Sequence, residues 1–176
     1  MGINASVGLK LKVTENVSGN VFSDVWWEGD FKYLRTFLDG VNAGEANRIV
    51  MLERTVASGA NDDIDLNGSI IHPVHGLINA AEIVGFIVAN RRASASGAAN
   101  TTNLTIGGGA NNATDAFITG TTKTIGPIRP GGCVVFFDPD ASGIGSVTAA
   151  TADIFRVANS AGASCTYVVI FLLRTS

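Results

Sequence analysis

The two histidines, His72 and His75, are the side chains best suited to hold a metal ion. They lie in the segment IHPVHG, on either side of a proline. A metal site needs three or four ligands, and the nearest acidic residues along the chain are Asp65 and Glu82. We therefore interpret the segment as a turn with two ordinary histidines, and we expect no metal and no cofactor. In a trimer with this turn near its axis, three copies could still gather a cation.

Aspartates cluster in two segments, NDDIDL (Asp62, Asp63 and Asp65) and FDPDASG (Asp138 and Asp140). Carboxylates of this kind could bind calcium together with carbonyl oxygens, but neither segment matches an EF-hand loop. Asp-Pro-Asp-Ala-Ser-Gly is equally a turn in which aspartate side chains accept hydrogen bonds from backbone N–H groups. We favour the turn over a calcium site.

Three consecutive glycines, Gly107 to Gly109, follow a strand-like run and resemble the start of a phosphate-binding loop. Such a loop needs a helix behind it and, in the Walker pattern, a Lys followed by Ser or Thr. No such helix is expected here, no Lys-Ser or Lys-Thr follows the glycines at the Walker spacing, and the third position of Gly-x-Gly-x-x-Gly is Asn112. A Gly-x-Ser-x-Gly nucleophile elbow is also missing. We expect a glycine-rich connection between strands, and a protein that is not an enzyme.

Trp26 and Trp27 are adjacent in the segment DVWWEGDF. Neighbouring residues of a strand point to opposite faces, so one tryptophan can enter the core while the other faces outward. An outward tryptophan costs least when a partner or a sugar covers it. The alternative is a bend that places both in the core. The pair is the candidate partner-binding site of the sequence.

The composition indicates one globular domain, residues 1–176, that is poorly charged. Nearly half of the residues are apolar, 15% are charged and the net charge is −3. A nucleic-acid platform would normally show a basic face, so we expect no nucleic-acid partner. The most apolar run, CTYVVIFLLR, is too short to cross a bilayer as a helix, so we expect no membrane contact. The low charge suggests that other subunits cover part of the surface.

Short apolar runs alternate with Gly, Asn and Ser turns along the whole chain, and helical periodicity is scarce. This rhythm predicts an all-β fold, an antiparallel β-sandwich of jelly-roll type with about nine strands. One short helix is expected in HPVHGLINAAE. The predicted strands are residues 7–16, 31–38, 47–56, 63–68, 81–91, 102–108, 133–139, 153–159 and 165–175.

Two predicted strands, 165–175 and the run Ile83–Val88, are apolar on both faces. A strand of a simple sandwich should be polar on its outer face. Either another part of the chain covers the second face, or a neighbouring subunit does. Cys133 and Cys165 lie inside apolar strand-like runs, and we expect both to be buried free thiols.

From Leu38 to Ser176 the order of turns resembles a group of small virion proteins of tailed bacteriophages. The resemblance rests on the Asp-Gly turn of LDGVNAG, the DLNG turn, the strand end TIGG, and the segments RPGG, PDASG and RVANS. It implies a β-rich, oligomeric, non-enzymatic protein that serves as capsid decoration or cement, as a head fibre or as a small tail component. The first forty residues match less well.

The sequence thus leads to the hypothesis of a decoration or cement protein on the capsid surface of a virion, assembled in the cytoplasm of the bacterial host. Its partners would be the major capsid protein and other copies of itself, most simply as a homotrimer. Residues 1–30 would form an N-terminal arm or a peripheral strand. The alternative is a receptor- or carbohydrate-binding head of a fibre, with Trp26, Trp27 and the aspartate-rich turns as contacts.

Overall fold

The computed structural model describes residues 2–17, 25–94, 98–109, 111–119 and 122–175, with the backbone alone for residues 13–17 and 25–28. Within these ranges the protein is all-β, without a helix, and every ladder between two strands is antiparallel. The described residues form twelve strands: β1 (Ala5–Val17), β2 (Val25–Phe37), β3 (Arg48–Val56), β4 (Asn61–Asp65), β5 (Asn67–His72), β6 (Gly76–Ala89), β7 (Leu104–Gly107), β8 (Thr124–Ile128), β9 (Cys133–Phe137), β10 (Gly145–Ser146), β11 (Ile154–Asn159) and β12 (Cys165–Thr175).

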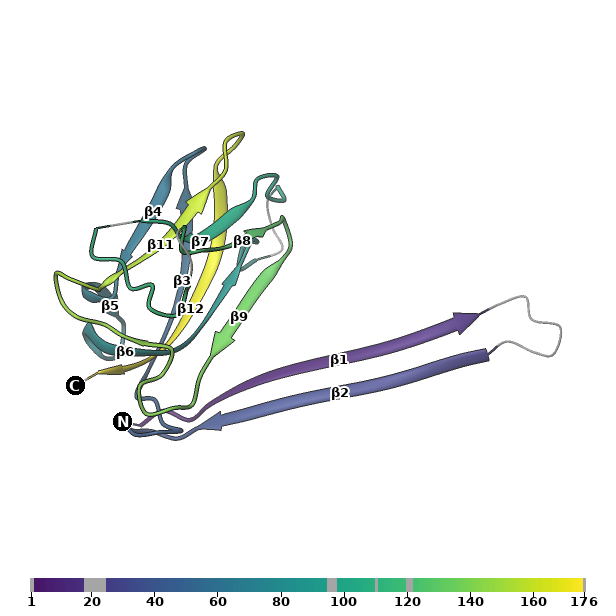
Figure 1. The fold of residues 1–176 in the computed structure, drawn as a ribbon, viewed down its shortest axis with the longest axis horizontal. Coiled ribbons are helices and arrows are strands. Elements are labelled where there is room, and N and C mark those ends of the chain that lie inside the picture. The colour runs from purple at the N-terminus through teal and green to yellow at the C-terminus, as the bar shows by residue number, and fades with distance from the viewer. Residues whose placement is uncertain (1, 18–24, 95–97, 110, 120–121, 176) are drawn as a thin grey trace.

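Two sheets make up the body of the molecule (Figure 1). In the larger sheet β12 lies between β3 and β6, and β6 also pairs with β5, β9 and β10. The smaller sheet has the order β4-β11-β7-β8. The core lies between the sheets: the ring of Phe155, from the smaller sheet, is 5.0 Å from the rings of both Phe86 and Phe171, from the larger one. Alternation along each strand supplies these inward side chains.

Strands β1 and β2 form a hairpin that projects from one end of the body, and we call this hairpin the arm (Figure 1). Its register runs without interruption from the pair Ala5 and Phe37 to the pair Val17 and Val25. No other strand pairs with either of them in the described chain. The arm is therefore a two-stranded ribbon whose outer edges are both unpaired.

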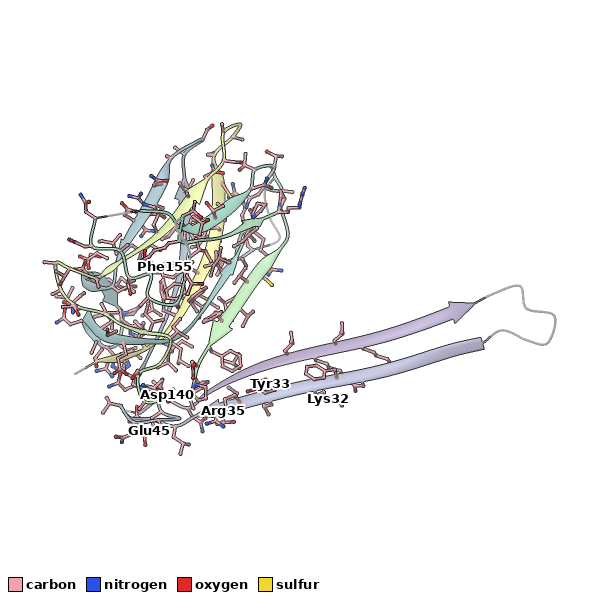
Figure 2. All side chains as sticks on the ribbon, viewed as in Figure 1. Lys32, Tyr33, Arg35, Glu45, Asp140 and Phe155 are labelled. Atoms are coloured by element: carbon pink, nitrogen blue, oxygen red, sulfur yellow. The ribbon has the colours of Figure 1, made fainter. Side chains whose placement is uncertain are left out.

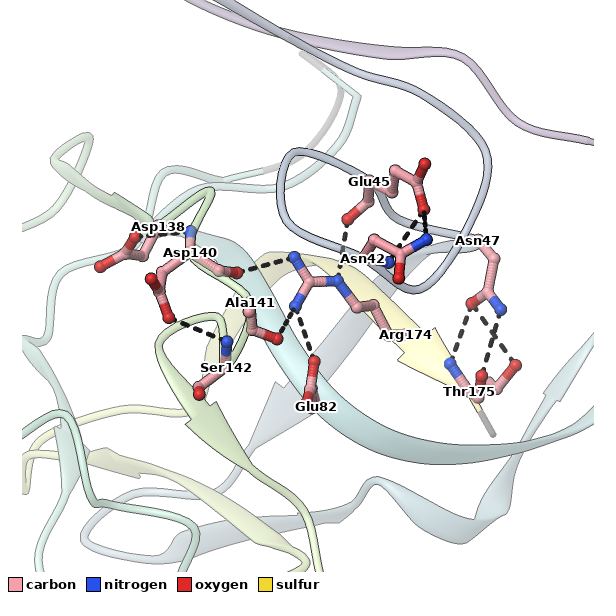
Figure 3. A network of polar contacts seen from close by, with 10 residues as sticks. All are labelled: Asn42, Glu45, Asn47, Glu82, Asp138, Asp140, Ala141, Ser142, Arg174 and Thr175. Carbon is pink, nitrogen blue, oxygen red and sulfur yellow. Dashed lines mark hydrogen bonds and ion pairs between the residues drawn. The ribbon is translucent and has the colours of Figure 1, made fainter.

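The segment that follows the arm is fixed to the body through Arg174, a charged side chain that is only 1% exposed (Figure 3). Its guanidinium donates hydrogen bonds to the carbonyl oxygens of Glu45, Ala141 and Asp140 at 2.6 to 2.9 Å, and it pairs with Glu82 at 2.7 Å. Such a buried charge is tolerable because every nitrogen of the guanidinium donates a hydrogen bond, one of them to a carboxylate. Arg174 of β12 thus joins the loop that follows β2, the loop that follows β9 and strand β6 at the base of the arm.

The observed strands agree with most of the predicted ones and correct others. Each of the nine predicted segments overlaps a strand, but the prediction merged β5 with β4 and missed β8 and β10. The predicted short helix is wrong. The backbone turns at residues 73–75, and β6 begins at Gly76, whose φ of 69° suits a glycine. The fourteen residues of β6 then pair with β5 and β12 instead of coiling.

The expectation of two buried thiols holds for Cys165 and is wrong for Cys133. Cys165 lies in the core, and its thiol contacts the Asn90 side-chain oxygen at 3.2 Å. Cys133 is exposed, because alternation along β9 points its side chain to the face of the larger sheet that is turned away from the core.

Candidate interaction surface

The arm has one apolar face, set by the register of its two strands. Residues that oppose each other in an antiparallel pair share a face, so Leu9 lies beside Tyr33 and Leu11 beside Phe31. These four side chains are 47 to 59% exposed, far more than apolar side chains of this size usually are. The arm's apolar face, as we use the term, comprises Ala5, Val7, Leu9, Leu11, Phe31, Tyr33 and Phe37, with Arg35 as its charged residue.

The opposite face of the arm is mostly polar, with Leu34 as an exposed apolar residue near the root. It carries Lys10 beside Lys32 and Lys12 beside Asp30, and Lys32 forms an ion pair with Asp30 at 2.8 Å. Figure 2 shows Lys32 and Tyr33 on the arm, well away from Phe155 in the body. The arm is therefore an amphipathic ribbon, and most of its apolar face has no cover within the described chain.

The larger sheet has a second apolar surface on the side away from the core, which we call the outer face. Here Met51, Ile170, Ile87 and Val135 form one row across four strands. The rows on either side complete the outer face with Ile49, Leu172, Gly85 and Phe137 and with Glu53, Val168, Ala89 and Cys133. Met51 is 60% exposed. β12 and β6 are apolar on both faces, as the sequence indicated, because one face of each strand lies in the core and the other belongs to the outer face.

The root of the arm packs against one edge of the outer face. Phe37 is fully buried in a cluster with Ala46, Val84 and Leu172, and Tyr33 lies 5.9 Å from the ring of Phe137. Ile3, Ala5 and Val7 pack against the same cluster. The arm's apolar face and the outer face therefore meet and form one continuous apolar surface with a bend.

A groove of about 480 Å³ follows this bend. Residues 3 and 4 and the root of the arm, residues 5–8, line one side, and the outer face contributes Ile49, Gly85, Ile87, Val135 and Ile170 among others. Gly85 is required at its floor, since a Cβ there would lie 2.6 Å from the Phe137 Cβ and 2.9 Å from the Phe136 carbonyl oxygen. The groove is open and apolar, a shape that suits another apolar element and offers few polar groups to orient a small molecule.

The tryptophan pair lies on the arm, although its side chains fall outside the described residues. Trp26 and Trp27 belong to β2, and their backbones pair with Asn16 and Glu15 of β1. Their role as partner contacts therefore stays a prediction from the sequence.

His72 and His75 lie in the turn between β5 and β6, with their rings 4.9 Å apart. The Nδ1 atom of His72 accepts hydrogen bonds from the backbone N–H groups of Val74 and His75 at 3.1 and 3.2 Å. Partial burial lowers the pKa of His75, and the charge of Arg48 lowers it further. Across the described ranges, no group of three or more His, Cys, Asp or Glu side chains is placed to hold a metal ion.

The aspartates of the first cluster form ion pairs and a turn. Asp62 accepts from Arg54 at 2.6 and 2.7 Å and from the Tyr167 hydroxyl at 2.7 Å. Burial, followed by this bond to Asp62, raises the pKa of Tyr167, while the bond to Asp62 raises the pKa of Arg54. Asp63 binds Arg156 at 2.6 and 2.8 Å, and this bond lowers the pKa of Asp63.

The remaining turn predictions agree with the structure. Asp138 and Asp140 each accept a hydrogen bond from the backbone N–H two residues further on, as the turn interpretation requires. The three glycines end β7 with φ values of 86°, 94° and 83°, in the left-handed region that favours glycine. An N-terminal arm or peripheral strand was expected over residues 1–30, but its pairing with β2 and its apolar face were missed, although the alternation of Ala5, Val7, Leu9 and Leu11 with polar or small residues was visible.

Comparisons with models of protein families, with curated proteins and with solved structures found no match for this chain. No helix long and apolar enough to cross a membrane occurs in the part of the chain that the structure describes.

Proposed function

We propose that this protein is a structural protein of a bacteriophage virion, a decoration or cement protein that covers the head and bridges subunits of the major capsid protein. The observation that carries the proposal is the arm, whose apolar face is left exposed beside an equally apolar outer face. A two-stranded ribbon is marginally stable by itself in water. Large exposed apolar patches mark interaction sites. Both properties fit a protein whose working state is an assembly.

The proposed action is mechanical. The body would serve as a jelly-roll-like sandwich, repeated as a homotrimer on the shell, and each copy would remove apolar surface from water as it joins its neighbours. Burial contributes about 25 cal/mol per Å², less the entropy of immobilising each copy. Because many copies act together on one shell, a modest contact per copy is enough to stabilise the particle. The turn signatures that resemble those of small virion proteins support this proposal.

Cosedimentation with heads stripped of decoration tests the proposal. We expect the full chain to pellet with such heads, and the stripped heads to withstand heating better once they are coated. The Trp26→Ala, Trp27→Ala double variant should bind at least tenfold more weakly if the pair contacts the shell, since a buried tryptophan at an interface contributes on the order of 2 kcal/mol. Failure of the full chain to bind heads of any kind would contradict the decoration role.

A further inference from the structure

We propose that the arm of each copy packs on the outer face of a second copy of this chain. The proposal rests on the assembly role above and names the partner that covers the two apolar surfaces. Each copy gives its arm to a neighbour and receives an arm from a neighbour. The ring closes when the rotation between copies allows it, as for other homo-oligomers.

The first argument comes from the contact that the chain makes with itself. The root of the arm's apolar face, at Val7 and Phe37, already packs against Leu172 and Phe137 of the outer face. The same two surfaces are therefore complementary at one edge of the sheet. A second arm would extend this contact into the groove and across the exposed row that contains Met51 and Val135.

The second argument is the area available. The free part of the arm spans ten residues in each strand, about 33 Å, and one face of such a ribbon covers roughly 300 Å². The outer face is four strands wide and roughly 20 Å long, which gives roughly 400 Å²; part of this is already covered within the chain, at Leu172 and Val168. One arm given and one received would bury on the order of 600 to 700 Å² per copy, close to the roughly 800 Å² per partner of a standard interface.

The third argument is charge. Among the described side chains, the free part of the arm carries no charged residue on its apolar face, and the outer face carries one, Glu53. Arg35 lies at the root of the arm, opposite Val7. The lysines lie on the other side of the arm, where they would remain in water when the apolar face docks.

Sedimentation of two charge variants, alone and mixed, tests the contact. Leu11→Glu places a carboxylate on the arm's apolar face, and Met51→Glu places one on the outer face. Both positions are more than half exposed in the single chain, so the fold should be unchanged by circular dichroism. Each variant alone should self-associate at least tenfold more weakly than the wild type. Ile71→Glu, which changes an exposed side chain outside both surfaces, is the matched control and should associate normally.

The mixture identifies the geometry. A Met51→Glu chain keeps an intact arm and a Leu11→Glu chain keeps an intact outer face, so the two should form a complex together although neither does so alone. Association of Leu11→Glu alone would indicate contact between outer faces, and association of Met51→Glu alone would indicate contact between arms. Either of these two results would overturn the proposal. It would also be overturned by a mixture that stays monomeric, or by a wild-type chain that is monomeric at about 100 μM.

Head binding separates this inference from the virion role. A wild-type chain that self-associates in the way described but does not bind stripped heads would remove the virion role and leave the contact between copies intact. A chain that binds heads but stays monomeric in solution would support the virion role and remove the contact between copies.

Discussion

At the scale of single residues, Asp63 is the carboxylate whose titration the structure ties most directly to folding. It joins β4 to β11 through Arg156, and the hydrogen bond from that guanidinium lowers its pKa below the ordinary value of 3.8. A carboxylate with a lowered pKa stabilises the fold above its unfolded pKa. The contribution is lost as the pH falls from about 5 through the folded pKa.

We therefore expect the Asp63→Asn variant to be less stable than the wild type at pH 7 and about equally stable at pH 2.5. The difference at pH 7 should be about 0.5 kcal/mol, because the Asp63 side chain is 42% exposed and water screens the pair. Urea unfolding at the two pH values measures it. Asp30→Asn, which changes an ion pair on the arm, serves as the control. A difference that persists at pH 2.5 would show that something other than the charge is responsible.

The two cysteines report on the two apolar surfaces. In the Met51→Glu variant, which we expect to be monomeric, a thiol reagent should label Cys133 within minutes and spare Cys165 until the protein is unfolded. Cys165 is buried, and burial raises the pKa of its thiol, so it carries little reactive thiolate. In the wild type at high concentration the labelling of Cys133 should be slow as well, since Cys133 lies on the outer face, which the arm of a second copy would cover. Rapid labelling of Cys165 in either protein would contradict its place in the core.

At the scale of elements, the arm should be separable from the body if the cut respects its root. Replacing residues 9–33 by a two-residue Asn-Gly turn leaves Ile3, Ala5, Val7 and Phe37 against the body. In the monomeric Met51→Glu background we expect this deletion to change the free energy of unfolding by less than about 1 kcal/mol, because the ring contact of Tyr33 with Phe137 is a minor part of the packing between arm and body. Urea unfolding measures the change. In the wild-type background the deletion should abolish self-association.

Phe37→Ala in the same background is the comparison for the deletion. Phe37 is fully buried, so its truncation should cost about 3 to 5 kcal/mol. A deletion that destabilises as much as this substitution would mean that the whole arm, and not only its root, supports the fold.

The elements also show what the sequence could and could not predict. Alternation and turn residues identified most strands, and the doubly apolar pattern of β12 predicted that a second surface needed cover. β8 was missed because Pro127 interrupts it, and a proline is tolerated there since β8 is an edge strand. The exposure of Cys133 and the projection of the arm depend on which strands pair. Pairing is decided by contacts between distant parts of the chain, which local patterns do not contain.

At the scale of the whole molecule, the exchange of arms would couple assembly to stability. Unfolding of an assembled chain requires dissociation, so the midpoint of thermal unfolding, Tm, rises with protein concentration. We expect a rise of about 2 °C for each tenfold increase in wild-type concentration. Scanning calorimetry or near-ultraviolet circular dichroism over a hundredfold range of concentration would measure it.

The Leu11→Glu and Met51→Glu variants provide the control for this coupling. Their Tm should not depend on concentration, and at low concentration all three proteins should converge. A wild-type Tm that is equally independent of concentration would contradict a contact that holds the folded copies together.

The buried guanidinium of Arg174 also sets how accurately the molecule can reach a neighbour. The arm is a lever about 43 Å long, and a change of about 5° at its base would move its tip by about 4 Å, close to the spacing of one strand. The hydrogen bonds of Arg174, with the bond from the Gly44 N–H to the Pro139 carbonyl oxygen at 2.7 Å, hold the pivot of this lever. A small change of angle at the base thus becomes a larger displacement at the tip, so the regularity of any lattice built through the arm depends on Arg174, a side chain buried inside its own chain.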